Sequence, residues 1–170
     1  SIDISEIKKT PISWVNRIDS ITDYDTELTL LDFINFMTDS KIKKKRLLEI
    51  LLTFNLLEKN LKKKIKHTPQ EDFKAVCLAI SLADNYQNIV IYDFIRNEKK
   101  KFELNFNQIL REKLKEGKAI LYLTTDLFYA CQIADRISFL KNGYLMPENP
   151  ILYEDIKEMD VMKLYKQFLS

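Results

Sequence analysis

The sequence predicts an α/β fold in which a parallel sheet is flanked by helices. Two uninterrupted apolar runs, Ile89 to Tyr92 and Ala119 to Leu123, have the composition of strands that are buried on both faces. Between them, apolar residues recur at helical spacing from Phe106 to Leu114, before Gly117. A strand, a crossover helix and a second strand form the unit from which parallel sheets are built.

The elements before this unit include one more strand and several helices. Ile12 to Asn16 is a short apolar run that predicts a strand, and Thr29 to Met37 predicts a helix with apolar residues on one face. A second helix is expected from Lys41 to about Leu57. The basic cluster at its start is interpreted as a solvated face, with an acidic or phospholipid headgroup contact as the alternative.

The remaining elements follow the same signals. Glu71 to Ala83 predicts a helix that is apolar nearly all round and therefore buried, after a break at Pro69. Leu127 to Ala134 predicts another helix. A hairpin with a tight Asn-Gly turn is expected from Ile137 to Met146, and Ile156 to Phe168 predicts a final amphipathic helix.

Length and composition limit the classes of protein that fit. The chain has 170 residues, 46% of them apolar, which is enough for one domain spanning residues 1–170. The 27 Lys and Arg residues nearly balance the 25 Asp and Glu residues, so a net charge of +2 gives no reason to expect a nucleic-acid partner.

The length of the apolar runs and the spacing of the cysteines indicate where in the cell the protein is expected. No apolar run reaches the roughly 18 residues that cross a bilayer, so contact with a membrane would come through a partner. Cys77 and Cys131 lack the spacing of a zinc site or a disulfide framework and are interpreted as small buried apolar groups. A cytoplasmic protein is therefore expected, at the inner face of the membrane if a partner holds it there.

Glycine usage argues against a site in which the backbone wraps a phosphate group. Only Gly117 and Gly143 occur, and the sequence contains no GxxxxGK[ST] motif. Such sites need glycine, because the main chain must turn tightly and bring its N–H groups against the phosphate oxygens. The sequence therefore predicts that this chain does not bind a nucleotide phosphate in a P-loop of its own.

Several strings resemble the C-terminal two-thirds of an ABC transporter nucleotide-binding domain. They are GKAILYLTTDL from Gly117 to Leu127, ADRI from Ala134 to Ile137, KNG from Lys141 to Gly143, and the apolar strand that ends at Asp93. The resemblance implies a partial P-loop NTPase-like sheet. It also implies an ABC-type helical subdomain at about residues 28–66, with residues 1–27 and 67–170 forming the α/β core and the C-terminal helix.

The resemblance also assigns positions of a nucleotide site, at which this sequence departs from the family. Asp93 stands at the Walker B aspartate, but Phe94 replaces the carboxylate that would polarise the attacking water. Thr125 occupies the position of the switch histidine, and Asn16 or Arg17 that of the Q-loop glutamine. Hydrolysis is expected to lack its general base.

The signature loop is altered as well. By the resemblance it aligns with Thr68, Pro69, Gln70, Glu71 and Asp72. Two carboxylates there would repel the γ-phosphate, and proline removes an N–H donor.

The family's P-loop strand and adenine-binding lobe would precede Ile12. The alternating residues Ser1 to Ser5 are a candidate substitute strand, and the alternative is that the chain is a piece of a longer one.

Some residues carry two interpretations. Asp93 is interpreted as a strand-end carboxylate that caps nearby N–H groups, with a Mg²⁺ ligand as the weaker alternative, and no other metal ligand is expected. The lone His67 is expected to face solvent rather than take part in catalysis. Trp14 is expected in the core or at a lobe interface.

Phe33 and Phe36 are likewise expected in the core or at a lobe interface. The alternative for both is a partner contact: the resemblance implies that the surface around Arg17 to Tyr24, with the helix that carries them, receives a membrane subunit.

The sequence therefore favours a non-catalytic ABC-like domain, not an enzyme, that acts through protein contacts. Its partner would be a second ABC ATPase subunit, a transporter membrane subunit or a second copy of the chain, and no cofactor is expected. ATP and Mg²⁺ would bind only if an upstream segment or a partner supplies the P-loop. Two alternatives stay open: part of a longer protein with weak or asymmetric ATP binding, and a scaffold or regulatory protein unrelated to transport.

Overall fold

The computed structural model describes residues 11–16, 27–38, 41–95, 98–156 and 160–168. The chain packs as two compact units, Ser1–Leu123 and Thr124–Ser170, each with its own internal contacts. The subdivision proposed from the sequence, with one domain over residues 1–170, stays a prediction.

The first unit is built on a three-stranded parallel sheet. Its strands are β1 (Ile12–Val15), β2 (Asn88–Tyr92) and β3 (Ala119–Leu123), in the spatial order β1-β2-β3. All three runs of the sequence that predict strands in this unit form them, and the predicted parallel sheet is confirmed.

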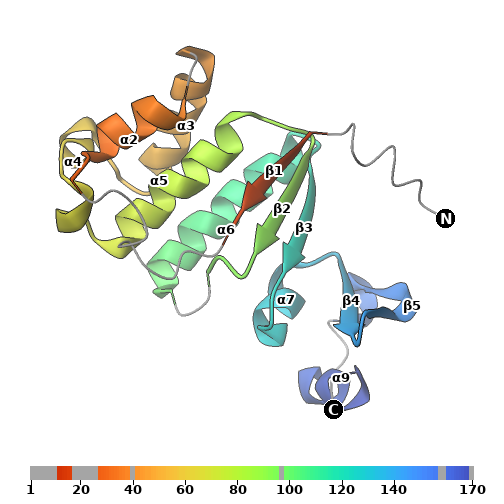
Figure 1. Ribbon diagram of the computed structural model, residues 1–170. Helices are drawn as coiled ribbons and strands as arrows, with labels where there is room; N and C mark the ends of the chain where they lie inside the picture. Colours follow the sequence, from red (N-terminus) through yellow and green to blue (C-terminus); the bar gives the residue numbers. More distant parts are fainter. Residues whose placement is uncertain (1–10, 17–26, 39–40, 96–97, 157–159, 169–170) are drawn as a thin grey trace. The chain divides into compact units, whose positions relative to one another are not determined.

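Two long helices cover one face of this sheet (Figure 1). They are α5 (Gln70–Ala83) and α6 (Lys100–Lys115). Both crossover connections run in the same direction along the sheet, and right-handed crossovers that do so place their helices on the same face. The core between helices and strands includes Phe73, Val76, Leu78, Ile89, Ile91, Phe102 and Phe106, each at most 3% exposed.

The helices described for the first unit leave the other face of its sheet uncovered. The strand register places Trp14, Val90 and Leu121 side by side on it, and Tyr92 beside Leu123. Trp14 and Leu121 are each 55% exposed. Burial of both faces of β3 was therefore a wrong expectation, and so was a core position for Trp14. The reason is the topology, which puts the helices of this unit on the opposite face.

Four short helices form a lobe of the first unit. They are α2 (Leu30–Met37), α3 (Lys41–Thr53), α4 (Glu58–Leu61) and the 3-10 helix η2 (Ile65–His67). Helix α3 ends before the predicted Leu57, because Asn55 adopts a left-handed backbone with φ of 58°. His67 is exposed, as expected. The apolar side chains buried in this lobe are Leu30, Ile34, Leu47, Ile50, Leu51, Leu56, Leu61 and Ile65.

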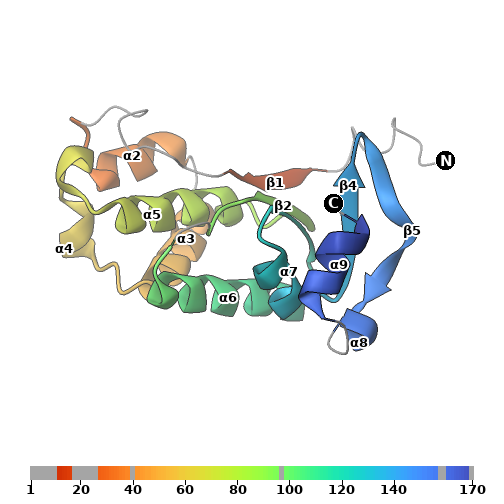
Figure 2. The ribbon, with the colours of Figure 1, turned by 90° about the horizontal axis from the view of Figure 1, so that it is seen from below.

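The second unit consists of a hairpin and three helices. Strands β4 (Arg136–Lys141) and β5 (Tyr144–Leu152) pair antiparallel, and the left-handed Asn142 and Gly143 form the predicted tight turn. Helices α7 (Leu127–Ile133), α8 (Tyr153–Ile156) and α9 (Val161–Phe168) complete it. Figure 2 shows α9 against the hairpin. The buried cluster of this unit, to which the hairpin, α8 and α9 contribute, is Ile137, Phe139, Ile156, Leu164 and Phe168.

The tail is not the single helix that was predicted from Ile156 to Phe168. Helix α8 ends at Ile156 and α9 begins at Val161. The reason is Asp160, whose Oδ1 accepts a hydrogen bond from the Met162 N–H at 2.8 Å, so that it caps the start of a new helix.

Candidate functional site

The candidate site lies at the carboxyl ends of the parallel strands. Asn16 directly follows β1 and Asp93 directly follows β2, so the sheet brings both residues to one edge. Asn16 is exposed there. Arg17, the other candidate for the Q-loop position, lies outside the described residues.

Asp93 is held at this edge in an unusual backbone conformation. Its φ is 43°, in the left-handed region that non-glycine residues seldom occupy. Its backbone N–H donates to the carbonyl oxygen of Leu123 at 2.8 Å, which continues the β2–β3 pairing by one residue. The residue is only 2% exposed. Asp93 is therefore enclosed at the end of the strand rather than presented to solvent.

Phe94 points into the hydrophobic core of the first unit. Its side chain is fully buried, and its ring centroid lies 5.4 Å from that of Phe106 and 6.1 Å from that of Phe102. Phe102 in turn contacts Phe54 at 4.9 Å. A phenyl ring in such a cluster contributes packing energy but cannot accept a proton.

The start of α5 brings together the residues at the signature-loop position. The Thr68 hydroxyl donates a hydrogen bond to the carbonyl oxygen of Lys64 at 2.9 Å, and this bond holds the side chain against the preceding turn. Pro69 is the N-cap residue and makes no side-chain cap, and Gln70 opens the helix. Thr68, Pro69 and Gln70 are therefore consecutive residues that lead into the first turn of α5.

Two carboxylates occupy the first turn of α5. Glu71 forms an ion pair with Lys99 at 2.5 Å. Burial raises the pKa of Asp72 above its ordinary value, and Lys63 opposes that shift. Acidic side chains offset the partial positive charge of a helix N-terminus. The N-terminus of α5 therefore has acidic side chains of its own beside its partial positive charge.

A buried ion pair beside this site was missed by the sequence analysis. Lys74 of α5 pairs with Glu98, which follows β2 in the chain, and their side chains are 6% and 10% exposed. With the pair between Glu71 and Lys99, it ties the segment after β2 to the first turns of α5. The available signal was a lysine within a helix predicted to be buried all round, since a buried ammonium needs a carboxylate.

Thr125 falls in the second unit. It is exposed and precedes α7, where Asp126 is the N-cap and its Oδ1 accepts from the Tyr129 N–H at 2.9 Å. Thr124 adds a second contact, since its Oγ1 accepts from the Asp126 N–H at 3.0 Å.

The residues predicted to contact a partner differ in exposure. Phe33 is half-buried, with its ring centroid 5.6 Å from that of Phe73. Because the side chain is only partly enclosed, the interpretation of Phe33 stays a prediction. Phe36, one turn further along α2, is 84% exposed, so it is not a core residue. Tyr24 lies outside the described residues, as does Arg17.

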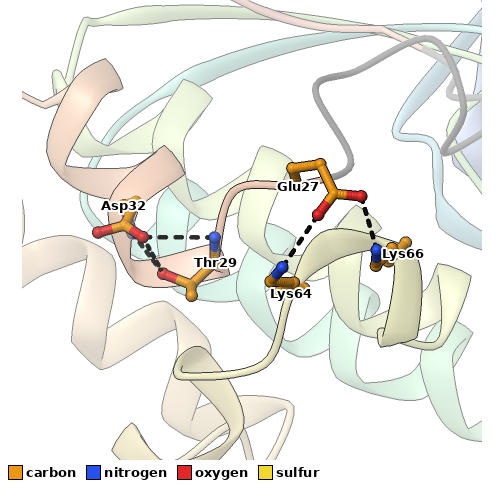
Figure 3. A network of polar contacts seen from close by, with 5 residues as sticks. All are labelled: Glu27, Thr29, Asp32, Lys64 and Lys66. Atoms are coloured by element: carbon orange, nitrogen blue, oxygen red, sulfur yellow. Dashed lines mark hydrogen bonds and ion pairs between the residues drawn. The ribbon is translucent and has the colours of Figure 1, made fainter.

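A network of polar contacts fixes the segment that leads into α2 (Figure 3). Thr29 and Asp32 form a reciprocal capping box, in which the Asp32 N–H donates to Thr29 Oγ1 at 3.1 Å. Glu27 accepts from Lys66 at 2.6 Å and from Lys64 at 2.9 Å. The hydrogen bonds from these two ammonium groups, of which Lys66 has the larger effect, lower the pKa of Glu27 to about 2.

The described residues contain no group of three or more His, Cys, Asp or Glu side chains that could hold a metal ion. Within the same part of the chain, no helix is both long enough and apolar enough to span a membrane.

The fold is α/β with a parallel sheet, and it is the fold of ABC transporter ATP-binding cassettes. The ATP-binding subunit of an ABC transporter superposes with a TM-score of 0.74 at 17% sequence identity, over 93% of this chain and 69% of its own. A bacterial ABC transporter cassette in a dimeric structure gives a TM-score of 0.66 at 22% identity, over 89% and 68%.

A dimeric post-hydrolysis state of an ATP-binding cassette, bound to ADP and Pi, gives the same values of 0.66, 22%, 89% and 68%. No protein-family model and no curated protein sequence matches the chain.

Proposed function

We propose that this chain is a non-catalytic domain with the ABC cassette fold that acts through protein contacts, as an accessory or degenerate partner of a transporter ATPase. The observation that carries the proposal is the burial of Phe94 beside Asp93. A cassette that hydrolyses ATP needs a group that polarises water next to the metal-binding aspartate. Here that position is a core side chain, packed against Phe102 and Phe106.

The start of α5 also fits a phosphate poorly. The carboxylates of Glu71 and Asp72 stand in its first turn, and Pro69 has no N–H to donate. An incoming triphosphate would meet like charge at this end of the helix. ATP and Mg²⁺ would therefore bind only where another segment or a partner supplies the groups that hold the phosphates.

A direct test is phosphate release from ATP and Mg²⁺ by the purified chain. The expected result is release no faster than in a protein-free blank, and equal release by the wild type and Asp93→Asn. Release that Asp93→Asn abolishes would show that the chain hydrolyses ATP at its own site and would end the proposal. The variant is a matched control, because a contaminating ATPase would be unaffected by it.

The partner we propose is a transporter subunit. The exposed ring of Phe36 on α2 is the described side chain best placed for such a contact, since exposed aromatic residues are enriched at interfaces. A neighbouring gene for a protein with several apolar helices would supply the candidate membrane subunit. Its product should co-purify with the wild type and with Leu104→Lys, but not with Phe36→Lys. Equal recovery by all three would remove Phe36 from the contact.

A further inference from the structure

The first unit has a cavity of about 450 Å³ at the amino ends of its strands, the end of the sheet opposite Asp93. Helix α3, the C-terminal half of α6 and the chain just before β2 and β3 line it. Its apolar lining residues are Ile50 of α3 and Ile109 of α6, which are 7% and 1% exposed. Small-molecule sites in proteins have volumes of roughly 300–1,000 Å³, so the cavity is large enough for a ligand.

The charged residues that line the cavity differ in depth. They are three cations and three carboxylates: Arg46, Lys113, Lys118, Glu49, Glu112 and Glu116. All three cations are half-buried, whereas all three carboxylates are exposed. The interior of the cavity is therefore cationic, and its rim is acidic.

Contacts within the chain leave two of the cations available to a ligand. Lys113 is neutralised by Glu116, whose Oε1 lies 3.0 Å from the lysine Nζ. Lys118 Nζ donates to the carbonyl oxygen of Asn85 at 3.0 Å, which uses one of its three hydrogens. Within the described part of the chain, neither Arg46 nor Lys118 forms an ion pair. Half-buried cations without a counter-ion favour an anionic group in the cavity.

Two carboxylates of the rim are available in the same way. Glu49 follows Arg46 by one turn of α3, and Glu112 lies on α6. Glu112 accepts a hydrogen bond from the neutral amide of Gln108 at 2.9 Å. No cation of the described residues forms an ion pair with Glu49 or Glu112. A ligand that carries an ammonium group next to its anionic group would therefore match both the interior and the rim.

We propose that this cavity binds a free α-amino acid with an apolar side chain, which has both charged groups on one carbon atom. Its carboxylate accepts hydrogen bonds from Arg46 and Lys118, and the planar guanidinium of Arg46 can donate two of them in parallel. Its ammonium group donates to Glu49 and Glu112 at the rim. Its side chain lies against the two isoleucines. The cavity and the nucleotide positions are at opposite ends of the strands, so this binding does not depend on whether ATP binds.

L-Leucine is the probe, because its side chain suits the apolar lining. Its titration into the purified chain, followed by amide NMR, should shift the resonances of Asn85, Lys113 and Lys118. Two analogues of L-leucine separate its charges: isocaproate lacks the ammonium group, and isoamylamine lacks the carboxylate. Each should bind at least about tenfold more weakly than L-leucine, because each leaves one set of charged partners without its hydrogen bonds.

The interior variant is Arg46→Met, which should weaken L-leucine binding by about tenfold or more. Lys101→Met is the matched control, because it removes an exposed cation of α6 that lies outside the cavity, and it should leave the dissociation constant unchanged. Glu49→Gln should weaken the binding of L-leucine but not that of isocaproate, a difference that a misfolded variant could not produce. The amide spectrum of each variant checks that it is folded.

Four outcomes would overturn the proposal. The first is the absence of any shift with L-leucine up to its solubility limit. The second is isocaproate binding as tightly as L-leucine, which means that the rim takes no part. The third is inorganic phosphate binding more tightly than L-leucine, which means a phosphate site. The fourth is L-leucine binding that Arg46→Met leaves unchanged, which places the site elsewhere.

Discussion

Replacing Phe94 with alanine tests whether this residue belongs to the core rather than to a site. Its side chain is fully buried against Phe102 and Phe106. Loss of the buried phenyl surface costs about 2 kcal/mol in transfer free energy. A residual cavity of about 80 Å³, at about 24 cal/mol per Å³, adds about 2 kcal/mol. Phe94→Ala should therefore lower the free energy of unfolding by about 4 kcal/mol.

Urea unfolding followed by Trp14 fluorescence measures this change within the first unit, at one fixed protein concentration. With an m value of about 2 kcal/mol/M, the midpoint should fall by about 2 M. Phe36→Ala is the matched control, because that ring is 84% exposed and its loss should change the free energy by less than about 0.5 kcal/mol. Equal midpoints for Phe94→Ala and Phe36→Ala would show that the Phe94 ring does not stabilise the core.

Three further predictions concern single groups. Lys74→Met leaves the Glu98 carboxylate buried without its cation, so it should lower the free energy of unfolding in urea by about 3–5 kcal/mol. The double variant Lys74→Met, Glu98→Met should recover most of that loss. Wild-type stability of Lys74→Met alone would contradict this prediction. The Glu27 carboxyl should titrate by NMR with a midpoint of about 2, and Lys66→Met should raise the midpoint. Since its folded pKa lies below the unfolded one, its contribution to stability is complete above pH 4.5 and is lost as the pH falls through 2; a wild-type midpoint near 4.5 would be inconsistent with the ion pairs. Burial raises the pKa of the Cys77 thiol from 9.0 to about 12. A thiol reagent at pH 8 should therefore modify Cys77 about a thousandfold more slowly in the native chain than in the unfolded chain. Equal modification rates, followed by peptide mass spectrometry, would argue against its burial.

Much of the backbone could be predicted from the sequence, because local patterns determine it. Apolar runs mark all three strands of the first unit, and the threonine that caps α2 stands at its predicted start. Where the predictions were wrong, a single residue redirected the chain. Asn55 in the left-handed region ends α3, and Asp160 begins a second helix in the tail.

The tertiary surroundings of the site were harder to predict. The family resemblance assigned Phe94 to the position of a catalytic carboxylate, and that assignment stays a prediction. The burial of Phe94 depends on Phe102 and Phe106 of α6. The exposure of Leu121 likewise follows from which face the crossover helices occupy, and an apolar run carries no information on that. Residues close in sequence therefore gave reliable predictions, and contacts between elements did not.

Isothermal titration calorimetry of ATP with Mg²⁺ into the purified chain tests whether the chain binds a nucleotide by itself. We expect no binding heat, because Glu71 and Asp72 stand in the first turn of α5 and the sequence has no GxxxxGK[ST] motif. Binding with a micromolar dissociation constant would contradict it, since the phosphates would then be held by groups of this chain.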